Sequence, residues 1–88
     1  MTEPEVYQLL TRIFNGVFER DDIALEPELT AADVVGWDSI KQVEILMQIE
    51  ESLGIKLSSR DIDSLRDVGD LAKIVRSRVN ARTSGAGQ

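Results

Sequence analysis

The 88-residue sequence contains no cysteine and no histidine. Without cysteine no disulfide framework is possible, which is compatible with a reducing cytosol. Without histidine, Ser-His-Asp and Cys-His catalysis are excluded and the usual zinc ligand is missing. Carboxylates remain as ligands for magnesium or calcium, but no segment resembles an EF-hand loop. We therefore expect no catalytic residues, no metal site and no enzymatic activity of the chain itself.

Basic residues are scarce, with 10 Lys and Arg against 16 Asp and Glu, which gives a formal net charge of −6. A nucleic-acid-binding protein needs a basic surface, so this class of function is excluded. An acidic surface instead suits transient docking of partners that carry basic patches. No apolar run approaches membrane-spanning length and no signal peptide opens the chain. We expect a cytoplasmic monomer.

The composition is that of one small globular domain, because 42% of the residues are apolar and only two are proline. A core of this size supplies roughly 3–5 kcal/mol of net stability. We assign the domain to residues 1–80. Residues 81–88 are small, polar and glycine-bearing, so they are predicted to form a flexible C-terminal tail.

The first helix is predicted to begin after Thr2, which forms a capping box with Glu5. Gly16 lowers the intrinsic helix propensity of this segment by about 1 kcal/mol. Apolar residues at three- and four-residue steps give it one buried face: Val6, Leu9, Leu10, Ile13, Phe14 and Val17.

Residues 20–37 follow no helical or strand period and are predicted to form a long loop with at most one short helical turn. Loops of this length are often functional, although a plain connection between helices is the alternative. The apolar residues expected to hold the loop on the core are Ile23, Leu25, Leu29, Val34 and Val35.

The second helix is predicted over residues 39–53, with Asp38 as its N-cap. Its inward face consists of Ile45, Leu46, Ile49 and Leu53. On the opposite side lies a mixed acidic and apolar stripe, which is typical of a recognition surface: Ile40, Glu44, Met47 and Glu51. The alternative is a helix buried on all sides, in which the two glutamates would need buried partners.

Predictions for the last part of the chain complete the fold. Gly54 is a left-handed C-cap, and the alternating residues 55–57 have no partner strand. Residues 59–65 form a short helix that buries Ile62 and Leu65, and Asp67 caps the last helix. The inward face of that helix consists of Leu71, Ile74, Val75 and Val79. The sequence thus predicts an all-α fold, a small four-helix bundle of three main helices and one short helix with a long loop after the first.

Five short motifs give the chain a family resemblance. They are Gly36-Trp37-Asp38-Ser39-Ile40, Val43-Glu44, Glu50-Glu51, Gly54-Ile55 and Val68-Gly69-Asp70-Leu71. At this spacing they resemble the acyl carrier protein family, including the related peptidyl carrier domains. The first helix and the loop fit the same pattern, so the resemblance covers nearly the whole chain apart from the tail.

The resemblance implies that a phosphopantetheinyl transferase attaches 4′-phosphopantetheine from coenzyme A to Ser39. Asp38 is implied to help position the metal and coenzyme during that transfer. The thiol of the arm would hold acyl groups as thioesters for partner enzymes of fatty acid, lipid or polyketide-type biosynthesis. These acyl-loading, acyl-processing or acyltransferase enzymes would carry basic docking patches. The residues expected to bind them are Ile40, Lys41, Glu44, Met47 and Glu51.

Ile40 stands where the family usually has leucine, which is a conservative change. Trp37 and Lys41 depart from the form used in fatty acid synthesis, and the tryptophan-Asp-Ser form resembles carriers dedicated to one pathway, so a specialised carrier rather than the housekeeping one is predicted. Trp37 is expected to anchor the loop on the core, or else to lie exposed beside the arm. Two alternatives remain for the chain: an unmodified helical adaptor that docks partners through the acidic helix face, and a peptidyl or aminoacyl carrier. A hydrolase with Ser39 as nucleophile has no visible base.

Overall fold

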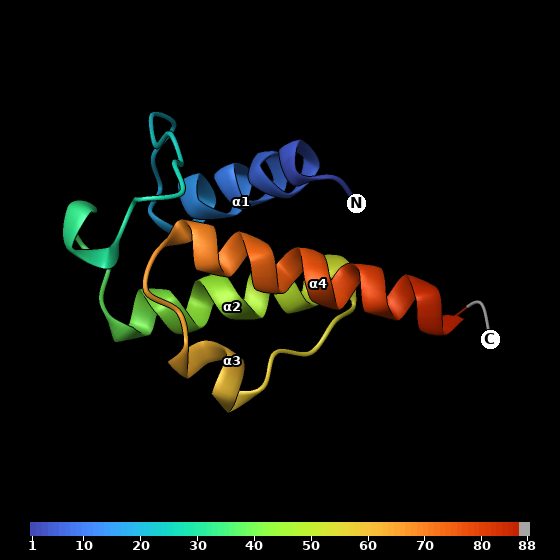
Figure 1. The fold of residues 1–88 in the computed structure, drawn as a ribbon. Helices are drawn as coiled ribbons and strands as arrows, with labels where there is room; N and C mark the ends of the chain where they lie inside the picture. The colour runs from blue at the N-terminus through green and yellow to red at the C-terminus, as the bar shows by residue number, and fades with distance from the viewer. Residues whose placement is uncertain (87–88) are drawn as a thin grey trace.

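The computed structural model describes the backbone of residues 1–86 and the side chains of residues 1–81. Its helices are α1 (Glu3–Val17), α2 (Ser39–Leu53), α3 (Ser59–Asp63) and α4 (Val68–Ala86), with a 3-10 turn, η1 (Ala31–Asp33), in the long loop. The described residues contain no strand (Figure 1). The predicted all-α bundle of three long helices and one short helix is confirmed. Within residues 1–86 no helix is both long and apolar enough to cross a membrane.

Helix α1 begins at the predicted capping box. The Glu5 amide donates to Thr2 Oγ1 at 3.4 Å, and the Thr2 amide donates to Glu5 Oε1 at 2.9 Å. Proline is tolerated in this first turn because the amides there have no partner inside the helix. The amphipathic face of α1 then packs on the other two long helices.

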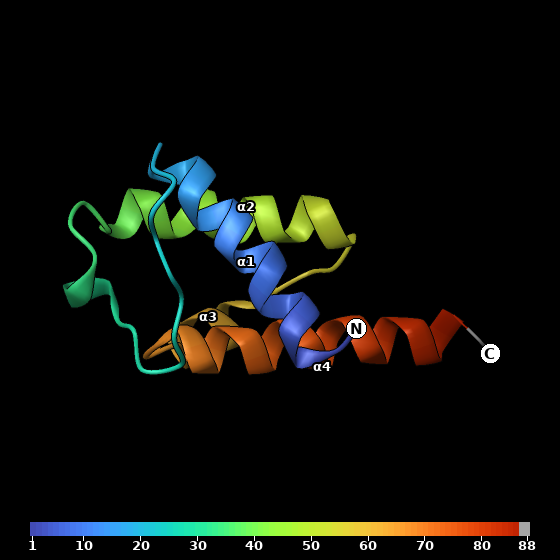
Figure 2. The same cartoon turned by 90° about the horizontal axis from the view of Figure 1, so that it is seen from above.

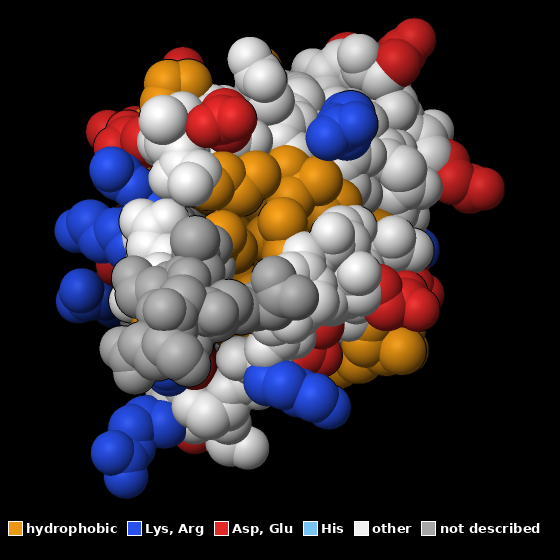
Figure 3. Space-filling view, turned by 90° about the vertical axis from the view of Figure 1, so that its right-hand side faces the viewer, with side chains coloured by type: hydrophobic (Ala, Val, Ile, Leu, Met, Phe, Trp, Pro, Cys, Tyr) orange, Lys and Arg blue, Asp and Glu red, His pale blue; other side chains and the backbone are white. Residues whose placement is uncertain are grey.

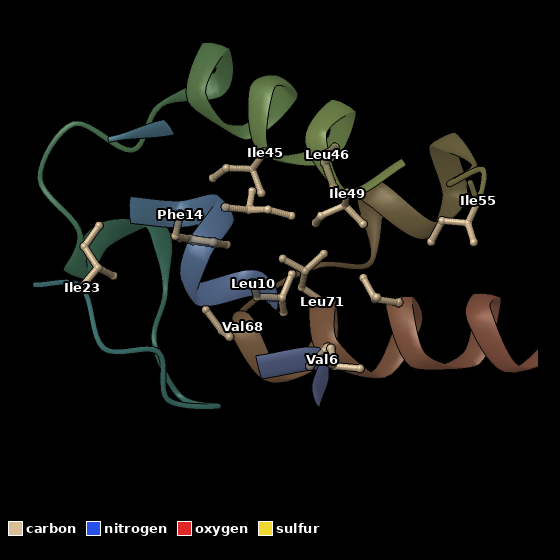
Figure 4. Close-up of a cluster of buried hydrophobic side chains, with 13 residues drawn as sticks. Val6, Leu10, Phe14, Ile23, Ile45, Leu46, Ile49, Ile55, Val68 and Leu71 are labelled. Carbon is tan, nitrogen blue, oxygen red and sulfur yellow. The ribbon is translucent and has the colours of Figure 1, made fainter. Parts of the chain in front are cut away.

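Figure 2 shows α1 crossing obliquely over α2 and α4, which lie alongside one another. Helix α1 contacts both of them, so it bridges the two lower helices of the bundle. The side chains in the middle of this arrangement point toward one another (Figure 4). The largest fully buried side chains are Phe14, Leu10, Ile45, Ile49, Val6, Val68 and Val75. These residues come from the predicted inward faces of the three helices and from the start of α4.

Two side chains of the long loop are buried, Ile23 and Val34, while Leu25 and Leu29 pack partly against the core. The prediction for Val35 was wrong, because its side chain is 89% exposed. The backbone near Ile23 is held by Asn15, whose Oδ1 accepts from the Ile23 amide at 2.9 Å and whose Nδ2 donates to the Ile23 carbonyl at 3.2 Å. A polar side chain on α1 therefore fixes the start of the loop.

Beyond α2 the chain turns at Gly54, which has the predicted left-handed backbone (φ 64°). Helix α3 ends at Asp63, two residues before the predicted end, and Ile62 and Leu65 are only partly buried. A five-residue helix has too few turns to develop a continuous buried face. An ion pair between Asp61 and Arg78 at 2.7 Å ties α3 to α4 instead.

Helix α4 begins where Asp67 Oδ1 accepts from the Asp70 amide at 2.9 Å. Its backbone stays helical to Ala86. The hydrogen bonds of a long helix propagate at little cost once its first turns are packed. Residues 87 and 88 of the predicted tail lie outside the described residues, and the flexibility of 81–88 stays a prediction.

Figure 3 shows Lys and Arg side chains gathered along the flank formed by α4. The exposed cations of that helix include Lys73, Arg76 and Arg78.

Candidate functional site

The candidate site is the N-terminus of α2, where the loop ends and the helix begins at Ser39. Asp38 has an extended backbone, and its Oδ1 accepts from the Lys41 amide at 2.9 Å. The Asp38 carbonyl accepts the first helical bond, from the Gln42 amide at 2.9 Å. Asp38 is therefore the N-cap that the sequence predicts, and it fixes the start of the helix at Ser39.

Ser39 is exposed, and its hydroxyl forms no hydrogen bond with any described residue. The amides of Ser39 and Ile40 also lack a hydrogen-bond partner in the described part of the chain, as expected for the first turn of a helix. Free amides and the positive end of the helix dipole favour a negative group at this point. The position of Ser39 thus suits a side chain that is to carry a phosphodiester.

Trp37 anchors the loop directly before the site. Its ring meets that of Phe14 edge-on, with 5.1 Å between centroids, and lies 6.4 Å from the ring of Phe18. Its Nε1 donates to Gln42 Oε1 at 2.8 Å, so the polar end of the indole is satisfied as well. Of the two interpretations of Trp37, the structure supports the one in which it holds the loop on the core.

Gly36 forms the turn that leads into Trp37, and its backbone φ of 88° is one that L-residues rarely adopt. The Trp37 amide closes the turn on the Val34 carbonyl at 3.2 Å. The motif Gly36-Trp37-Asp38-Ser39 therefore has a separate physical task at each position: turn, anchor, cap and exposed hydroxyl.

Lys41 makes a contact that sequence reasoning missed. Its Nζ donates to the Val17 carbonyl at 3.4 Å and lies 3.6 Å from Glu44 Oε2. The Val17 carbonyl belongs to the last turn of α1, where carbonyls are unpaired and a cation is favoured. Only the Glu44 pair could be foreseen, since it lies one turn along the same helix. Lys41 therefore joins the end of α1 to the start of α2.

A match to the family model described as "Phosphopantetheine attachment site" covers residues 8–75, most of the chain. The chain belongs to the acyl carrier protein family. The match includes α2, α3, the long loop, most of α1 and the first part of α4, so it draws on every helix of the bundle.

Individual members of the family are similar over three quarters or more of their lengths. Acyl carrier protein 2 of Ralstonia nicotianae is 30% identical over 81 residues, which are 92% of this chain and 100% of that protein. The meromycolate extension acyl carrier protein of Mycolicibacterium smegmatis is 31% identical over 85% of this chain and 76% of its own. The solution structure of the holo acyl carrier protein of Geobacter metallireducens superimposes with a TM-score of 0.86 and 32% identity, covering 90% of this chain and 91% of that one.

Membership of the acyl carrier protein family makes 4′-phosphopantetheine the covalent prosthetic group of this protein. The surroundings of Ser39 fit such a group, because the hydroxyl is exposed and the nearby amides are free. The second carboxylate oxygen of Asp38 is also without a hydrogen-bond partner among the described residues. Residues 1–81 contain no cluster of three side chains that could hold a metal ion.

The outward face of α2 carries the other residues that the sequence singled out in this carrier protein. Ile40 is 69% exposed and Met47 57% exposed, and Glu44 and Glu51 are exposed beside them. The alternative of a helix buried on all sides is therefore wrong. Val43, at 54% exposed, is a further apolar residue of this surface that the sequence reasoning left out. It lies one turn from Ile40, and its spacing could have revealed it.

Proposed function

We propose that Ser39 is the residue that carries 4′-phosphopantetheine, and that the chain holds acyl intermediates on this arm as thioesters. The observation that supports this most strongly is the exposed, unbonded hydroxyl of Ser39 on the first residue of a capped helix. In the loading step the Ser39 oxygen loses its proton and forms the phosphodiester bond, while coenzyme A releases adenosine 3′,5′-bisphosphate. When bound, the group supplies the thiol that this cysteine-free sequence lacks.

In this proposal the chain presents its cargo and does not transform it. No base contacts the Ser39 hydroxyl among the described residues, and the sequence has no histidine. The work of the protein is positional: Asp38 fixes the helix start, and Trp37 fixes the loop before it. Chemistry at the thioester is left to partner enzymes.

We further propose a specialised carrier of a fatty acid, lipid or polyketide-type pathway. Trp37 and Lys41 both have structural tasks here, and both depart from the housekeeping pattern. Among the relatives, several carry the name meromycolate extension acyl carrier protein, which supports a lipid pathway.

Partner enzymes are proposed to dock on the outward face of α2. It combines exposed apolar side chains with acids, and the residues assigned to it are Ile40, Lys41, Glu44, Met47 and Glu51. The double variant Glu44→Lys with Glu51→Lys should weaken docking of a partner with a basic patch and reduce the salt dependence of its affinity. Unchanged affinity would move the interface to another face.

The attachment site is tested by intact mass after incubation with coenzyme A, magnesium and a broad-specificity phosphopantetheinyl transferase. Wild type should gain one phosphopantetheine and Ser39→Ala none. Ser59→Ala is the matched control, because Ser59 is also the exposed first residue of a helix that follows a capping residue. Wild type that stays unmodified although folded would favour the unmodified adaptor.

Loss of loading in Ser39→Ala must not come from unfolding. The Ser39 side chain makes no hydrogen bond to the described residues, and Asp38 supplies the cap. The free energy of unfolding should therefore change by no more than about 0.5 kcal/mol. Urea denaturation followed by circular dichroism measures this, and a larger loss would contradict the purely tethering role of Ser39.

A further inference from the structure

An open groove of about 930 Å³ lies between α1 and α2. The two helices cross obliquely (Figure 2). The α2 wall contains Lys41, Glu44, Met47 and Glu51, which belong to the proposed partner face. The α1 wall contains Gly16 and the residue just beyond the helix, Glu19. No part of the proposed function accounts for this α1 wall.

Gly16 has no packing reason to be glycine. It lies inside α1, is exposed, and a Cβ added to it would meet no atom within 4 Å. Glycine is the least favourable helix residue apart from proline, because it loses the most backbone entropy on folding. By contrast, a Cβ at Gly69 would come within 3.1 Å of the Pro27 carbonyl oxygen, so that glycine is explained by packing. Gly16 weakens α1 without any gain within the fold.

Glu19 is also unfavourable for stability, but for the opposite reason: it is a non-glycine residue at a position that favours glycine. Its backbone is left-handed (φ 54°), which no other non-glycine residue of the described chain shares. It directly follows the C-cap Phe18, at the position where helices most often use glycine for this conformation. The Glu19 side chain is exposed and forms no ion pair or hydrogen bond with the described residues. The strain in the Glu19 backbone is therefore not offset by any contact that its carboxylate makes with the described residues.

Local choices that oppose folding are expected at functional positions. Here two such choices, Gly16 and Glu19, lie three residues apart on the same wall of one groove. The missing Cβ at Gly16 lowers that wall, and Glu19 supplies a free negative charge at its end. At the α2 wall, Met47 is a partly exposed apolar surface, and Glu51 is a second carboxylate with no ion pair in residues 1–81.

We propose that this groove receives a basic segment of the transferase that loads Ser39, so that α1 as well as α2 forms the docking site. This inference rests on the proposed function. Before the arm exists, the loading enzyme must bring its active centre to the Ser39 hydroxyl itself. It must therefore contact the surface that adjoins Ser39, and the groove begins at Lys41, two residues away.

The charges of the groove define the segment that fits it. Lys41 is already paired with Glu44 at 3.6 Å, which leaves the carboxylates of Glu19 and Glu51 for cations of the partner. From Lys41 to Glu51 the α2 wall is about 15 Å long at the helical rise per residue. The segment should thus carry Lys or Arg near both ends and an apolar residue between them, over Met47. Arg12 also lines the groove and opposes such a segment.

The test measures kcat and KM for the carrier in the loading reaction, at saturating coenzyme A and with a broad-specificity transferase. Gly16→Gln raises the α1 wall without changing charge, and Glu19→Gly removes the carboxylate while relieving the left-handed strain. Each variant should melt at a temperature at least as high as wild type, with a rise of about 4 °C expected for Glu19→Gly. Each should nevertheless raise KM about fivefold or more with little change in kcat.

Two charge variants sharpen the test. Glu19→Gln keeps the side-chain shape and should raise KM, whereas Glu26→Gln, which makes the same charge change in the loop outside the groove, should not. Arg12→Gln should lower KM about twofold, because it removes the cation that opposes the partner. Added salt should raise the KM of wild type more than that of Glu19→Gln.

If wild type is loaded but the folded Gly16 and Glu19 variants keep KM within twofold of wild type, the groove proposal is overturned and the carrier function stands. Wild type that is not loaded at all would instead overturn the carrier function and this inference with it. An equal rise of KM in Glu26→Gln and Glu19→Gln would also count against the groove, because it would indicate a response to net charge alone.

Discussion

The two sides of the α2 N-terminus are packed in different ways. On the α1 side, Trp37 lies against two phenylalanine rings and Lys41 reaches the last turn of α1. On the other side, a cleft of about 60 Å³ is lined by Trp37, Gln42, Leu65 of the connection after α3, and Leu71 of α4. No residue of α3 is buried. The difference indicates that the candidate site is fixed from the α1 side, whereas the part of the chain around α3 is packed more loosely.

This asymmetry has a physical basis in helix length. A 15-residue helix such as α1 places several side chains on one face and buries them together. The five-residue α3 can bury little, so it depends on polar contacts: its Ser58 cap and the Asp61–Arg78 ion pair. Polar contacts near the surface contribute less to stability than apolar burial and are more sensitive to pH and salt. Helix α3 should therefore open before the rest of the bundle.

The largest expected effect is that of Phe14→Ala. Phe14 is fully buried and supports Trp37, so its truncation should cost about 3–5 kcal/mol, as much as the whole stability expected of a domain this size. Urea denaturation should find the variant largely unfolded. Phe18→Ala is the matched control, since that ring is only partly buried and should cost clearly less. Equal losses would mean that the α1 side is not organised around Phe14.

A smaller effect is expected from Ile62→Ala in α3. Because Ile62 is only partly buried, the loss of unfolding free energy should be about 1–2 kcal/mol or less. Hydrogen exchange should accelerate mainly at the amides of residues 59–65, with the amides of α1 and α2 nearly unchanged. Uniform acceleration throughout the bundle would instead show that α3 unfolds only together with the core.

The smallest expected effect is a pH-dependent loosening of α3. The Asp61 pKa lies below its ordinary value of 3.8, first because the carboxylate accepts the hydrogen bond of a Ser58 backbone group and then because Arg78 is paired with it. A lowered pKa in the folded state stabilises the fold above pH 3.8, and this contribution is lost as the pH falls further, through the folded-state pKa. Amide chemical shifts of α3 should follow that loss.

Arginine variants isolate the contribution of the ion pair to this titration. Arg78→Gln removes the paired cation, so the Asp61 pKa should rise towards its ordinary value and α3 should loosen at a higher pH. Arg76→Gln is the control, because Arg76 is exposed on the same helix and pairs with no described carboxylate. Identical titrations in the two variants would show that Arg78 does not contribute to the lowered pKa of Asp61 or to the stability of α3.

The long helices and the candidate site were largely predictable, because their signals are local. The capping box at Thr2 and the cap at Asp38 fix the starts of α1 and α2, and Gly54 ends α2 at the predicted residue. The exposed stripe of α2 followed from the 3.6-residue period. Sequence reasoning could therefore place Ser39 on an exposed helix start without any knowledge of the tertiary structure.

Predictions failed where no period applies or where the contact is long-range. In the loop, Val34 is buried and Val35 exposed, and an aperiodic segment gives no means of choosing between them. The contact from Lys41 to Val17 joins residues 24 apart, and only the packing of α1 on α2 brings them together. The left-handed backbone of Glu19 has no sequence signal either, since glutamate is not a residue that favours it.

The placement of Trp37 gives this protein a built-in optical probe. It is the single tryptophan of the chain, it lies two residues before Ser39, and its indole is enclosed by Phe14, Phe18 and Gln42. Indole emission depends on the polarity around the ring, so its wavelength reports directly on the loop at the site. Every change that lifts this loop from α1 becomes visible as a red shift in intrinsic fluorescence, with no label attached.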